Sequence, residues 1–351
     1  MRHAILAVAL VIAPTSLLAQ QRPSTLAGRS TVYAPRGAVA TSQPLASAAA
    51  LAVLQRGGNA IDAAVTAAAV LTVVEPYMTG IGGDLFAMVW SAEDRTLTGL
   101  NASGRSGSRM TREELIRRGH ESVPLFGAEP ITVPGTISGW TALLERFGTI
   151  SLAEALEPAI RLAEEGFPVS PIIARDWAAE AERLRDDTGA RATFLVDGER
   201  GPRAGEWFQN PDYALTLREI ASNGPGYLYG GPLGERIVEH VRSLGGFLEL
   251  DDLASHEVSW VKPFSVPFHG VRLWELPPNG QGIAALEMLR ILEDYDLAAM
   301  GHNSATYLHH LIEAKKLAYA DLDRYIGDPA HMRVQPERLL DDDFIRARRA
   351  L

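Results

Sequence analysis

His309 and Glu313 stand four residues apart on a predicted helix spanning residues 305–325, with His310 beside them. Residues spaced in this way lie one turn apart on a helix, and imidazole and carboxylate groups are ligands that zinc accepts. The spacing is not that of an HExxH motif, and Asp321, a conceivable third ligand, lies two turns further on. The pattern favours an exposed helix face with an i,i+4 pair, and we predict no metal site.

A serine or cysteine nucleophile has little support in the sequence. The chain has no cysteine, which excludes a thiolate nucleophile, a disulfide framework and a cysteine-based metal site. Ser138 lies in the run TISGW, where the first glycine of a GxSxG nucleophile elbow is missing. Asp321, Asp323 and Arg324 are interpreted as charges on a helix surface, and residues 341–343 as a solvated cap of a terminal helix.

Residues 57–90 contain a helix, a glycine-rich loop and a strand, around which the chain is expected to be organised. Asn59 is a good helix N-cap, and Asp62 follows three positions later, as in a capping box. The helix runs to Val73 and ends before Pro76, and the loop TGIGGD and the apolar strand LFAMVW follow. A dinucleotide fingerprint needs strand, loop and helix in that order with GxGxxG spacing, so this loop is interpreted as a tight backbone passage, with a phosphate-binding loop as the alternative.

The remaining pattern mixes helices and strands along the whole chain, which predicts an α/β or α+β class. The segment NASGRSGS, residues 101–108, is expected to be a flexible connection with one fixed charge, Arg105. Further helices are expected at residues 44–55, 112–119, 136–147, 152–165, 177–185, 235–244 and 283–297, and strands at residues 37–40, 97–100, 257–261, 264–268 and 271–276.

Composition and the N-terminus limit the class of protein. The net charge of -10 argues against nucleic acid or an anionic membrane surface as a partner. Residues 1–19 have the pattern of a secretory signal peptide, with a basic start, a short apolar run and Ala19 before Gln20. No stretch is long enough to span a membrane in the mature form. We expect a signal peptide at residues 1–19, an N-terminal tail at 20–36, a folded region at 37–351, and a periplasmic or secreted location.

Several blocks of the sequence together resemble the large subunit of the gamma-glutamyltransferases, also called gamma-glutamyltranspeptidases or glutathione hydrolases. The blocks occur in family order and cover most of residues 38–343. The combination of SGR with GIGGDLF looks more like the acylase-type branch of that family. The matching blocks are PLASAAALAVLQRGGNAIDAAV, VVEPYMTGIGGDLFAMV, ITVPGTISGW, LAEALEPAIRLAEEGFPVSP, PPNGQGIAALEMLRILEDYDL and EAKKLAYADLDRYIGDP.

The resemblance implies the αββα sandwich of an N-terminal-nucleophile hydrolase, with this chain as its large-subunit half. It implies a proenzyme that cuts itself into a large and a small chain. A threonine that begins the small chain attacks the acyl donor with its own α-amine as base, and the acyl group passes to water or a second amine. No cofactor is implied. Because no such threonine precedes Leu351, we expect the nucleophile beyond it, a small subunit as heterodimer partner, and an isolated chain that is inactive and poorly soluble.

The resemblance also implies that one arginine of the large chain pairs with the donor's α-carboxylate, and Arg105 is its match here. A guanidinium suits that task because it is always charged and can bind a carboxylate with two hydrogen bonds. Family transferases typically read R-E-x-A-P where this chain reads S-G-R-S-G-S, and counting back from Thr111 without gaps reaches Ser103 instead. The alternatives are a solvated loop arginine at this position, or Arg109 as the binding residue.

The main hypothesis is therefore an exported gamma-glutamyl hydrolase or transferase that cleaves gamma-glutamyl amides such as glutathione. An acylase-type amidohydrolase of the same family is the alternative. From other classes, a periplasmic solute-binding protein would share the N-terminal pattern and the acidity, and a non-catalytic remnant would share the blocks. The order of helix, glycine loop and strand argues against the solute-binding protein.

Overall fold

The computed structural model describes residues 32–351, and the chain divides into two units, residues 1–38 and residues 39–351. The predicted signal peptide and residues 20–31 of the predicted tail lie outside the described residues. In the first unit, residues 32–38 form neither helix nor strand. The strand expected at residues 37–40 is a wrong prediction: no described strand pairs with this segment, and a short extended run needs such a partner to form a ladder.

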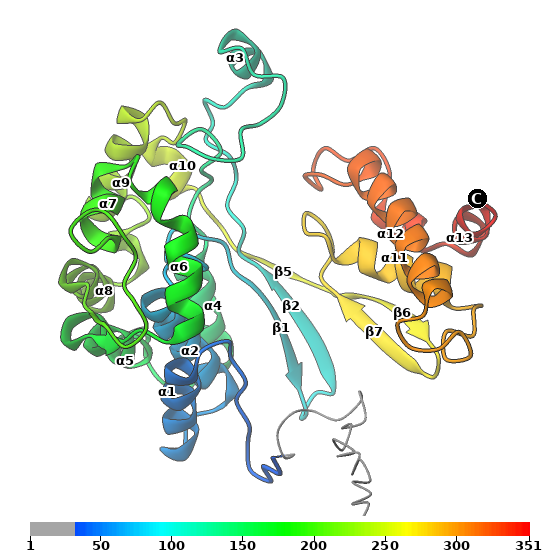
Figure 1. The fold of residues 1–351 in the computed structure, drawn as a ribbon, viewed down its shortest axis with the longest axis horizontal. Helices are drawn as coiled ribbons and strands as arrows, with labels where there is room; N and C mark the ends of the chain where they lie inside the picture. The colour runs from blue at the N-terminus through cyan, green and yellow to red at the C-terminus, as the bar shows by residue number, and fades with distance from the viewer. Residues whose placement is uncertain (1–31) are drawn as a thin grey trace, which may run out of the picture. The chain divides into compact units, whose positions relative to one another are not determined.

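The second unit is mixed α and β and mostly helical, as Figure 1 shows. The bounds predicted for α1, α4 and α12 agree with the structure. Its helices are α1 Pro44–Gln55, α2 Ala60–Val74, α3 Arg112–Arg117, α4 Thr136–Phe147, α5 Leu152–Glu165, α6 Pro171–Leu184, α7 Thr188–Phe194, α8 Pro211–Asn223, α9 Pro232–Ser243, α10 Leu250–Ala254, α11 Gly282–Leu292, α12 Ala305–Tyr325 and α13 Asp342–Arg349, with 3₁₀ turns η1 Pro225–Tyr227 and η2 Pro336–Leu340.

The strands form three small antiparallel sheets. The largest has the order β1-β2-β5, in which Phe86 pairs with Asn101 and Gly99 with Val261. Antiparallel pairing with the helices set apart from the strands is typical of the α+β class, which confirms the coarser class prediction. The strands are β1 Phe86–Ser91, β2 Thr96–Asn101, β3 Phe167–Pro168, β4 Trp207–Phe208, β5 Ser259–Val261, β6 Phe264–Phe268 and β7 Val271–Glu275; β3 pairs with β4, and β6 with β7.

Helix α2 lies at the centre of the main hydrophobic core. The predicted capping box is present: the Asn59 side chain accepts from Asp62 N, and Asp62 Oδ2 accepts from Asn59 N at 2.8 Å. Alanines such as Ala63 and Ala67 are buried and let neighbouring helices approach closely. The core also contains the fully buried Trp140 of α4. The main core therefore combines small side chains on α2 with a large one on α4.

The two faces of strand β1 differ in burial. Ala87 and Val89 pack against the main core, on the side where the helices lie. Phe86, Met88 and Trp90 point to the other face, because successive side chains alternate across a strand, and Trp90 is 60% exposed. One face of this sheet is thus covered by helices, and the other presents an apolar row to solvent.

Of the two sequence-based interpretations that concern helix α12, one is correct and one is wrong. His309 and Glu313 are solvent-exposed and form an i,i+4 pair at 4.0 Å, as an exposed helix face requires. Asp321 was expected on the helix surface but is only 2% exposed. It accepts two hydrogen bonds from Arg348 of α13, and the buried Glu287 of α11 lies nearby. The error arose because α11 and Arg348 of α13 cover the face of α12 that carries Asp321. Charge patterning along the sequence does not reveal such coverage.

Among residues 32–351, the structure has no helix whose length and apolar character would allow it to cross a membrane.

Candidate functional site

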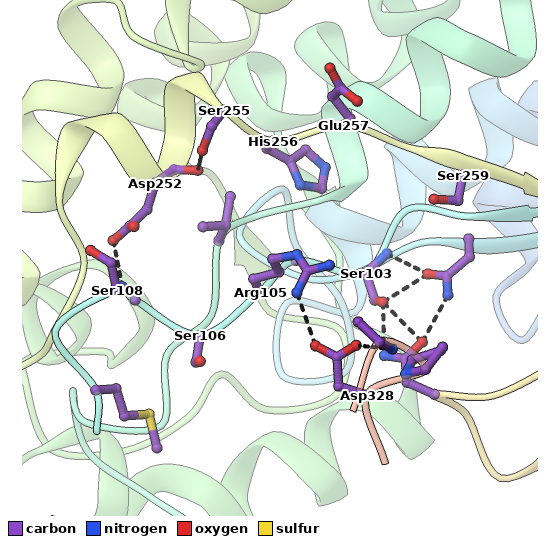
Figure 2. A pocket seen from close by; sticks show the side chains of 18 of the residues that line it. Ser103, Arg105, Ser106, Ser108, Asp252, Ser255, His256, Glu257, Ser259 and Asp328 are labelled. Atoms are coloured by element: carbon purple, nitrogen blue, oxygen red, sulfur yellow. Dashed lines mark hydrogen bonds and ion pairs between the residues drawn. The ribbon is translucent and has the colours of Figure 1, made fainter. Parts of the chain in front are cut away.

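A polar cavity of about 970 Å³ lies where four segments of the second unit meet, and Figure 2 shows it from close by. The first segment is residues 101–108, which follow β2, and the second runs from α10 into β5. The third is the turn that holds Asn279, between β7 and α11. The fourth is residues 328–331, just past the end of α12. Segments far apart in the sequence thus build one site, mostly in connections and at the ends of helices and strands.

The glycine-rich loop before β1 holds the first segment in place. Gly83 O accepts hydrogen bonds from Gly135 N at 2.9 Å and from Thr136 N at 3.0 Å. Asp84 Oδ1 accepts from Gly104 N at 3.0 Å. A side chain on Gly104 would place its Cβ 1.6 Å from Val133 O, so only glycine permits this close approach. Within the glycine-rich loop itself, an added Cβ on Gly80 or Gly82 would meet nothing within 4 Å, so the interpretation of this loop as a tight backbone passage is wrong for these two glycines.

The expectation that residues 101–108 form a flexible connection is wrong for their backbone. Arg105 O accepts from Val133 N at 2.9 Å, and Ser106 forms an isolated bridge with Thr132. Further along, Ser108 N donates to Asp252 Oδ2 at 3.0 Å. Small residues in this segment therefore serve close packing rather than mobility.

Arg105 projects into the cavity and is bound at one point. Its Nη1 donates to Asp328 Oδ2 at 2.9 Å, and the side chains are 75% and 40% exposed. In the part of the chain that the structure describes, no other hydrogen bond of the Arg105 side chain is found. The hydrogen bond from Ala330 N, together with the nearby charges of Arg105 and His331, holds the pKa of Asp328 below its usual range. Asp328 is therefore ionised at neutral pH, and most of the guanidinium donors of Arg105 remain available.

Ser103 belongs to a small network of hydrogen bonds beside Arg105. Its Oγ donates to Asn101 Oδ1 at 2.7 Å and accepts from Asn279 Nδ2 at 2.9 Å. Asn101 Nδ2 donates to Asn279 Oδ1 at 2.8 Å, which closes the ring. The network joins the end of β2 to the turn before α11. It fixes one wall of the cavity with neutral donors and acceptors.

His256 lies on another wall and is held by its neighbours. Its ring stacks on Tyr229 at 5.4 Å between centroids, and its Nε2 is 2.8 Å from Ser138 Oγ. Because Ser138 Oγ donates to Gly135 O at 2.7 Å, it can only accept from His256, so Nε2 carries the proton. Burial lowers the pKa of His256, and the charge of Asp84 opposes that shift only partly. This serine is thus a hydrogen-bonded support and not an activated nucleophile.

The cavity lining has more fixed negative than fixed positive charge. It contains the carboxylates of Asp252, Glu257 and Asp328, against the single guanidinium of Arg105. Asp252 is already occupied, since Oδ2 accepts from Ser108 N and from Glu249 N at 2.9 Å. Figure 2 shows Glu257 on the far side of His256 from Asp328. Asp328 is thus the carboxylate that lies directly beside Arg105.

Of the sequence-based candidates, the cavity brings together Ser103 and Arg105 and leaves out Arg109. Arg109 Nη1 instead pairs with Glu249 at 3.2 Å. Sequence reasoning missed Asn279, His256 and Asp328 as lining residues. Asn279 and Asp328 lie in dense turn sequences, PPNGQG and GDP, which were used only to end secondary-structure elements. The presence of polar side chains in such turns was the available signal.

No group of three or more histidine, aspartate or glutamate side chains suited to a metal ion occurs within residues 32–351. The polar side-chain groups of the cavity are hydroxyl, amide, carboxylate, imidazole and guanidinium groups. Such groups can bind and orient a polar organic ligand, but the site contains no group activated for covalent attack.

Comparisons with known proteins agree with this geometry. The glutathione hydrolase-like YwrD proenzyme of Bacillus subtilis is 39% identical over 303 residues, which cover 86% of this chain and 57% of that protein. The crystal structure of cephalosporin acylase from Bacillus halodurans matches with a TM-score of 0.87 and 41% identity, covering 95% of this chain and 63% of that one. The gamma-glutamyltranspeptidase of Helicobacter pylori matches with a TM-score of 0.85 and 30% identity, covering 92% and 93%.

The chain spans only 57% of the length of the YwrD proenzyme, so the similarity concerns only part of that protein. The family model described as gamma-glutamyltranspeptidase matches residues 46–351, which is most of the sequence and nearly all of the second unit. The chain therefore belongs to the gamma-glutamyltranspeptidase family.

Proposed function

We propose that this chain is the large-subunit part of an enzyme that transfers a gamma-glutamyl group from an amide donor to water or to an amine. The nucleophile of this proposal is the threonine that begins a second chain of the same precursor, and its α-amine is the base. The large chain binds the donor. The observation that carries the proposal is Arg105, a guanidinium in a polar cavity, with one exposed carboxylate as its partner and free donors on the rest of the group.

The chemistry of Arg105 fits the α-carboxylate of a gamma-glutamyl donor. A guanidinium binds a carboxylate through two parallel hydrogen bonds, and the single contact with Asp328 leaves a second edge for such a pair. The Ser103 network next to it offers neutral polar groups for the rest of the donor. Hydrogen bonds to the backbone of residues 101–108 fix the position from which the Arg105 side chain extends. These features favour Arg105 over Arg109, which is bound to Glu249 outside the cavity.

A second chain also fits the uncovered face of strand β1. Phe86, Met88 and Trp90 form an apolar row on that face, and a partner sheet packed there would bury them. Such packing would complete the four-layer αββα sandwich. The relatives described as proenzymes are consistent with a large and a small chain from one precursor. On this proposal, the 351-residue chain alone is inactive and poorly soluble.

An acylase-type amidohydrolase is the second candidate, and a specific observation favours it. The cephalosporin acylase of Bacillus halodurans is 41% identical, whereas the gamma-glutamyltranspeptidase of Helicobacter pylori is 30% identical. In both candidates the threonine performs the same attack. They differ in the acyl group that the cavity must recognise.

The deciding experiment measures hydrolysis of two anilides by the two-chain protein, made from a reading frame that includes the second chain. We expect gamma-glutamyl p-nitroanilide to be cleaved with a much higher kcat/KM than an acyl anilide without an α-carboxylate. The reverse preference would replace the proposal with the acylase. Threonine-dependent turnover by the 351-residue chain alone would contradict the assignment of the nucleophile to a second chain.

We propose in addition that the protein is exported, on the basis of the N-terminal pattern alone. Mass spectrometry of material from a Gram-negative host should then find a mature N-terminus near Gln20. An intact Met1 would contradict export.

A further inference from the structure

Three ionisable side chains meet where helix α11 packs against α12 and α13, towards the C-terminal end of the chain (Figure 1). Glu287 of α11 is 1% exposed and Asp321 of α12 is 2% exposed. Asp321 accepts two hydrogen bonds from Arg348 of α13. In the described part of the chain, neither carboxylate oxygen of Glu287 has a hydrogen-bond donor, although Asp321 lies within hydrogen-bonding reach. Two carboxylates can bond to each other only when one carries a proton, because an ionised carboxylate is purely an acceptor.

This proton decides the net charge of the buried cluster. When it is present, one carboxylate and one guanidinium balance each other. When it is absent, two adjacent carboxylates face a single guanidinium, and a buried charge without a partner is costly. Burial and the neighbouring Asp321 raise the pKa of Glu287 to about 8, and the opposing effect of Arg348 is smaller. The cluster is therefore balanced at neutral pH and gains a negative charge in the alkaline range.

The charges that act on Glu287 come from two neighbouring helices. Asp321 and Arg348 are the charged groups that shift its pKa, and Tyr325 of α12 lies near Arg348. Strand β6, which also packs on α11, has no charged residue. The charged residues of β7 and η2 have other surroundings: Arg272 donates to Ser265, Arg338 pairs with Asp341, Glu275 lies beside Gly282, and Glu337 is exposed.

Helix α13 depends mainly on polar contacts for its attachment to the fold. Of its eight residues, only Ile345 is buried. Arg349 Nε donates to the backbone oxygen of Ile291 at 2.9 Å, and Asp342 pairs with Arg290 of α11. A helix with so little buried apolar surface gains little from the hydrophobic effect. Its docking is therefore sensitive to the charges beneath it.

We propose that the proton shared by Glu287 and Asp321 is a pH-sensitive switch that keeps α13 docked on α11 and α12, and that its loss releases this helix. Once both carboxylates are ionised, they repel each other in a site that excludes water, and hydration relieves that repulsion. The side chain of Arg348 is 24% exposed, so water reaches the pair from the side of α13. Arg348 also attracts the second carboxylate, but burial and Asp321 outweigh this attraction.

The switch is a property of the fold of this chain and goes beyond the proposed function. It does not involve Arg105, the acyl donor or the nucleophile. Failure of the switch would leave the proposed function in place, and failure of the proposed function would leave the switch in place.

The test compares hydrogen exchange of the backbone amides of α13 in the full-length protein and in the variant Glu287→Gln. Both are measured at the same pH, so that the intrinsic pH dependence of exchange cancels. The amide of Gln is uncharged and can donate to Asp321 at every pH, as the protonated acid does. Glu287→Met replaces this variant if it does not fold, since Met removes the charge and the proton together. The amides of α12 serve as the internal reference.

At pH 5 we expect parent and variant to exchange alike, because Glu287 is protonated in the docked state. As pH rises towards the docked-state pKa of about 8, the opening constant of α13 in the parent should rise by up to about tenfold per pH unit and then level off. In Glu287→Gln it should stay constant. At pH 8 the amides of α13 in the parent should exchange faster than those of α12.

Three results would overturn the switch. Equal exchange of α13 in parent and variant at every pH would show that the proton does not control docking. Slower exchange of α13 in the parent than in the variant as pH rises would show that ionised Glu287 holds Arg348 more tightly. Exchange of α12 and α13 at the same rate in the parent would show that the cluster affects only global unfolding.

Discussion

Two arginine–aspartate pairs involve helix α12 or the turn just after it, and they differ in burial. Arg105 and Asp328 have side chains that are 75% and 40% exposed, and they share one hydrogen bond. Arg348 and Asp321 are 24% and 3% exposed and share two. Buried charges that lose their partner are costly, whereas exposed pairs contribute little. The buried pair is therefore suited to hold α13 on the fold, and the exposed pair is suited to exchange partners with a ligand.

The largest expected effect is the loss of the buried pair. Arg348→Met removes the guanidinium and leaves Asp321 as an uncompensated buried charge, so the free energy of unfolding should fall by about 3–5 kcal/mol. Arg105→Met, the matched change at the exposed pair, should lower it by at most about 1 kcal/mol. Urea unfolding of both variants measures the difference. Similar losses in the two variants would remove the distinction between the pairs.

A buried and an exposed capping box extend the comparison to other parts of the fold. Asp62 is fully buried and accepts from Asn59 N at 2.8 Å and from Thr149 N at 2.8 Å. Burial alone would raise the pKa of Asp62, but the hydrogen bonds from Thr149, Asn59 and Ile150 outweigh it and hold the pKa below its usual value. The stabilisation is therefore present above the unfolded pKa and is lost as pH falls through the folded one.

Asp62→Asn should lower the free energy of unfolding at pH 7 by about 1.5–3 kcal/mol, because the amide presents N–H groups to donors that need an acceptor. Glu154→Gln is the control, since Glu154 has the same role at the exposed start of α5. Its effect should be much smaller. Chemical denaturation at pH 7 and pH 3 compares them, and an Asp62→Asn protein as stable as the parent at pH 7 would refute the account of this box.

For the exposed pair, the expected effect is on substrate binding. Arg105→Lys keeps the charge but loses the second hydrogen bond, and charge-assisted bonds of this kind contribute about 1.5–3 kcal/mol. Affinity for a gamma-glutamyl donor should fall roughly ten- to a hundredfold, mainly in KM, because the contact is remote from the reacting carbonyl. Arg105→Ala should cost more. Steady-state kinetics of the matured enzyme measure both, and a loss confined to kcat would argue against a binding role.

A pH dependence of stability is also expected near the buried pair. Burial, together with the neighbouring Asp321, raises the pKa of Glu287 to about 8, while Arg348 opposes the shift. Glu287 thus holds its proton more tightly in the folded chain. Its stabilising contribution is complete below the unfolded pKa of about 4.3 and is lost as pH rises through the folded pKa.

Between those values the free energy of unfolding should fall with pH, by at most about 1.4 kcal/mol per unit from this group. Glu287→Gln should flatten this part of the profile. Thermal or urea unfolding between pH 5 and pH 9 measures the slope. A profile that is identical in parent and variant would show that Glu287 does not titrate in this range.

Local signals in the sequence predicted much of the helical structure. Asn59, Ser151 and Ser304 mark helix starts because their side chains satisfy free backbone N–H groups, and all three do so in the structure. These interactions reach only three residues along the chain. They are therefore readable from one sequence without knowledge of the tertiary fold.

The errors concern residues whose environment depends on distant segments. Asp321 was interpreted as a surface charge, but its partner Arg348 lies on another helix. The segment around Arg105 was expected to be flexible, but Val133 and Asp252 hold its backbone. Such contacts are set by tertiary packing, which local patterns do not encode.

The dependence on tertiary packing also explains which residues of the site could be predicted from the sequence and which could not. Arg105 was identified through a family resemblance that preserves order along the chain. Asp328 was not recognised as a lining residue, since only the fold brings the end of α12 beside residues 101–108. The turn sequences that contain Asn279 and Asp328 were visible, but their place around one cavity was not.

The most direct test of the central claim is a crystal structure of the matured enzyme with glutamate, the acyl product of gamma-glutamyl hydrolysis, bound in the cavity. The account predicts the α-carboxylate of glutamate within about 3 Å of the Arg105 guanidinium, in a paired hydrogen bond. Glutamate bound elsewhere, with Arg105 still paired only to Asp328, would contradict it.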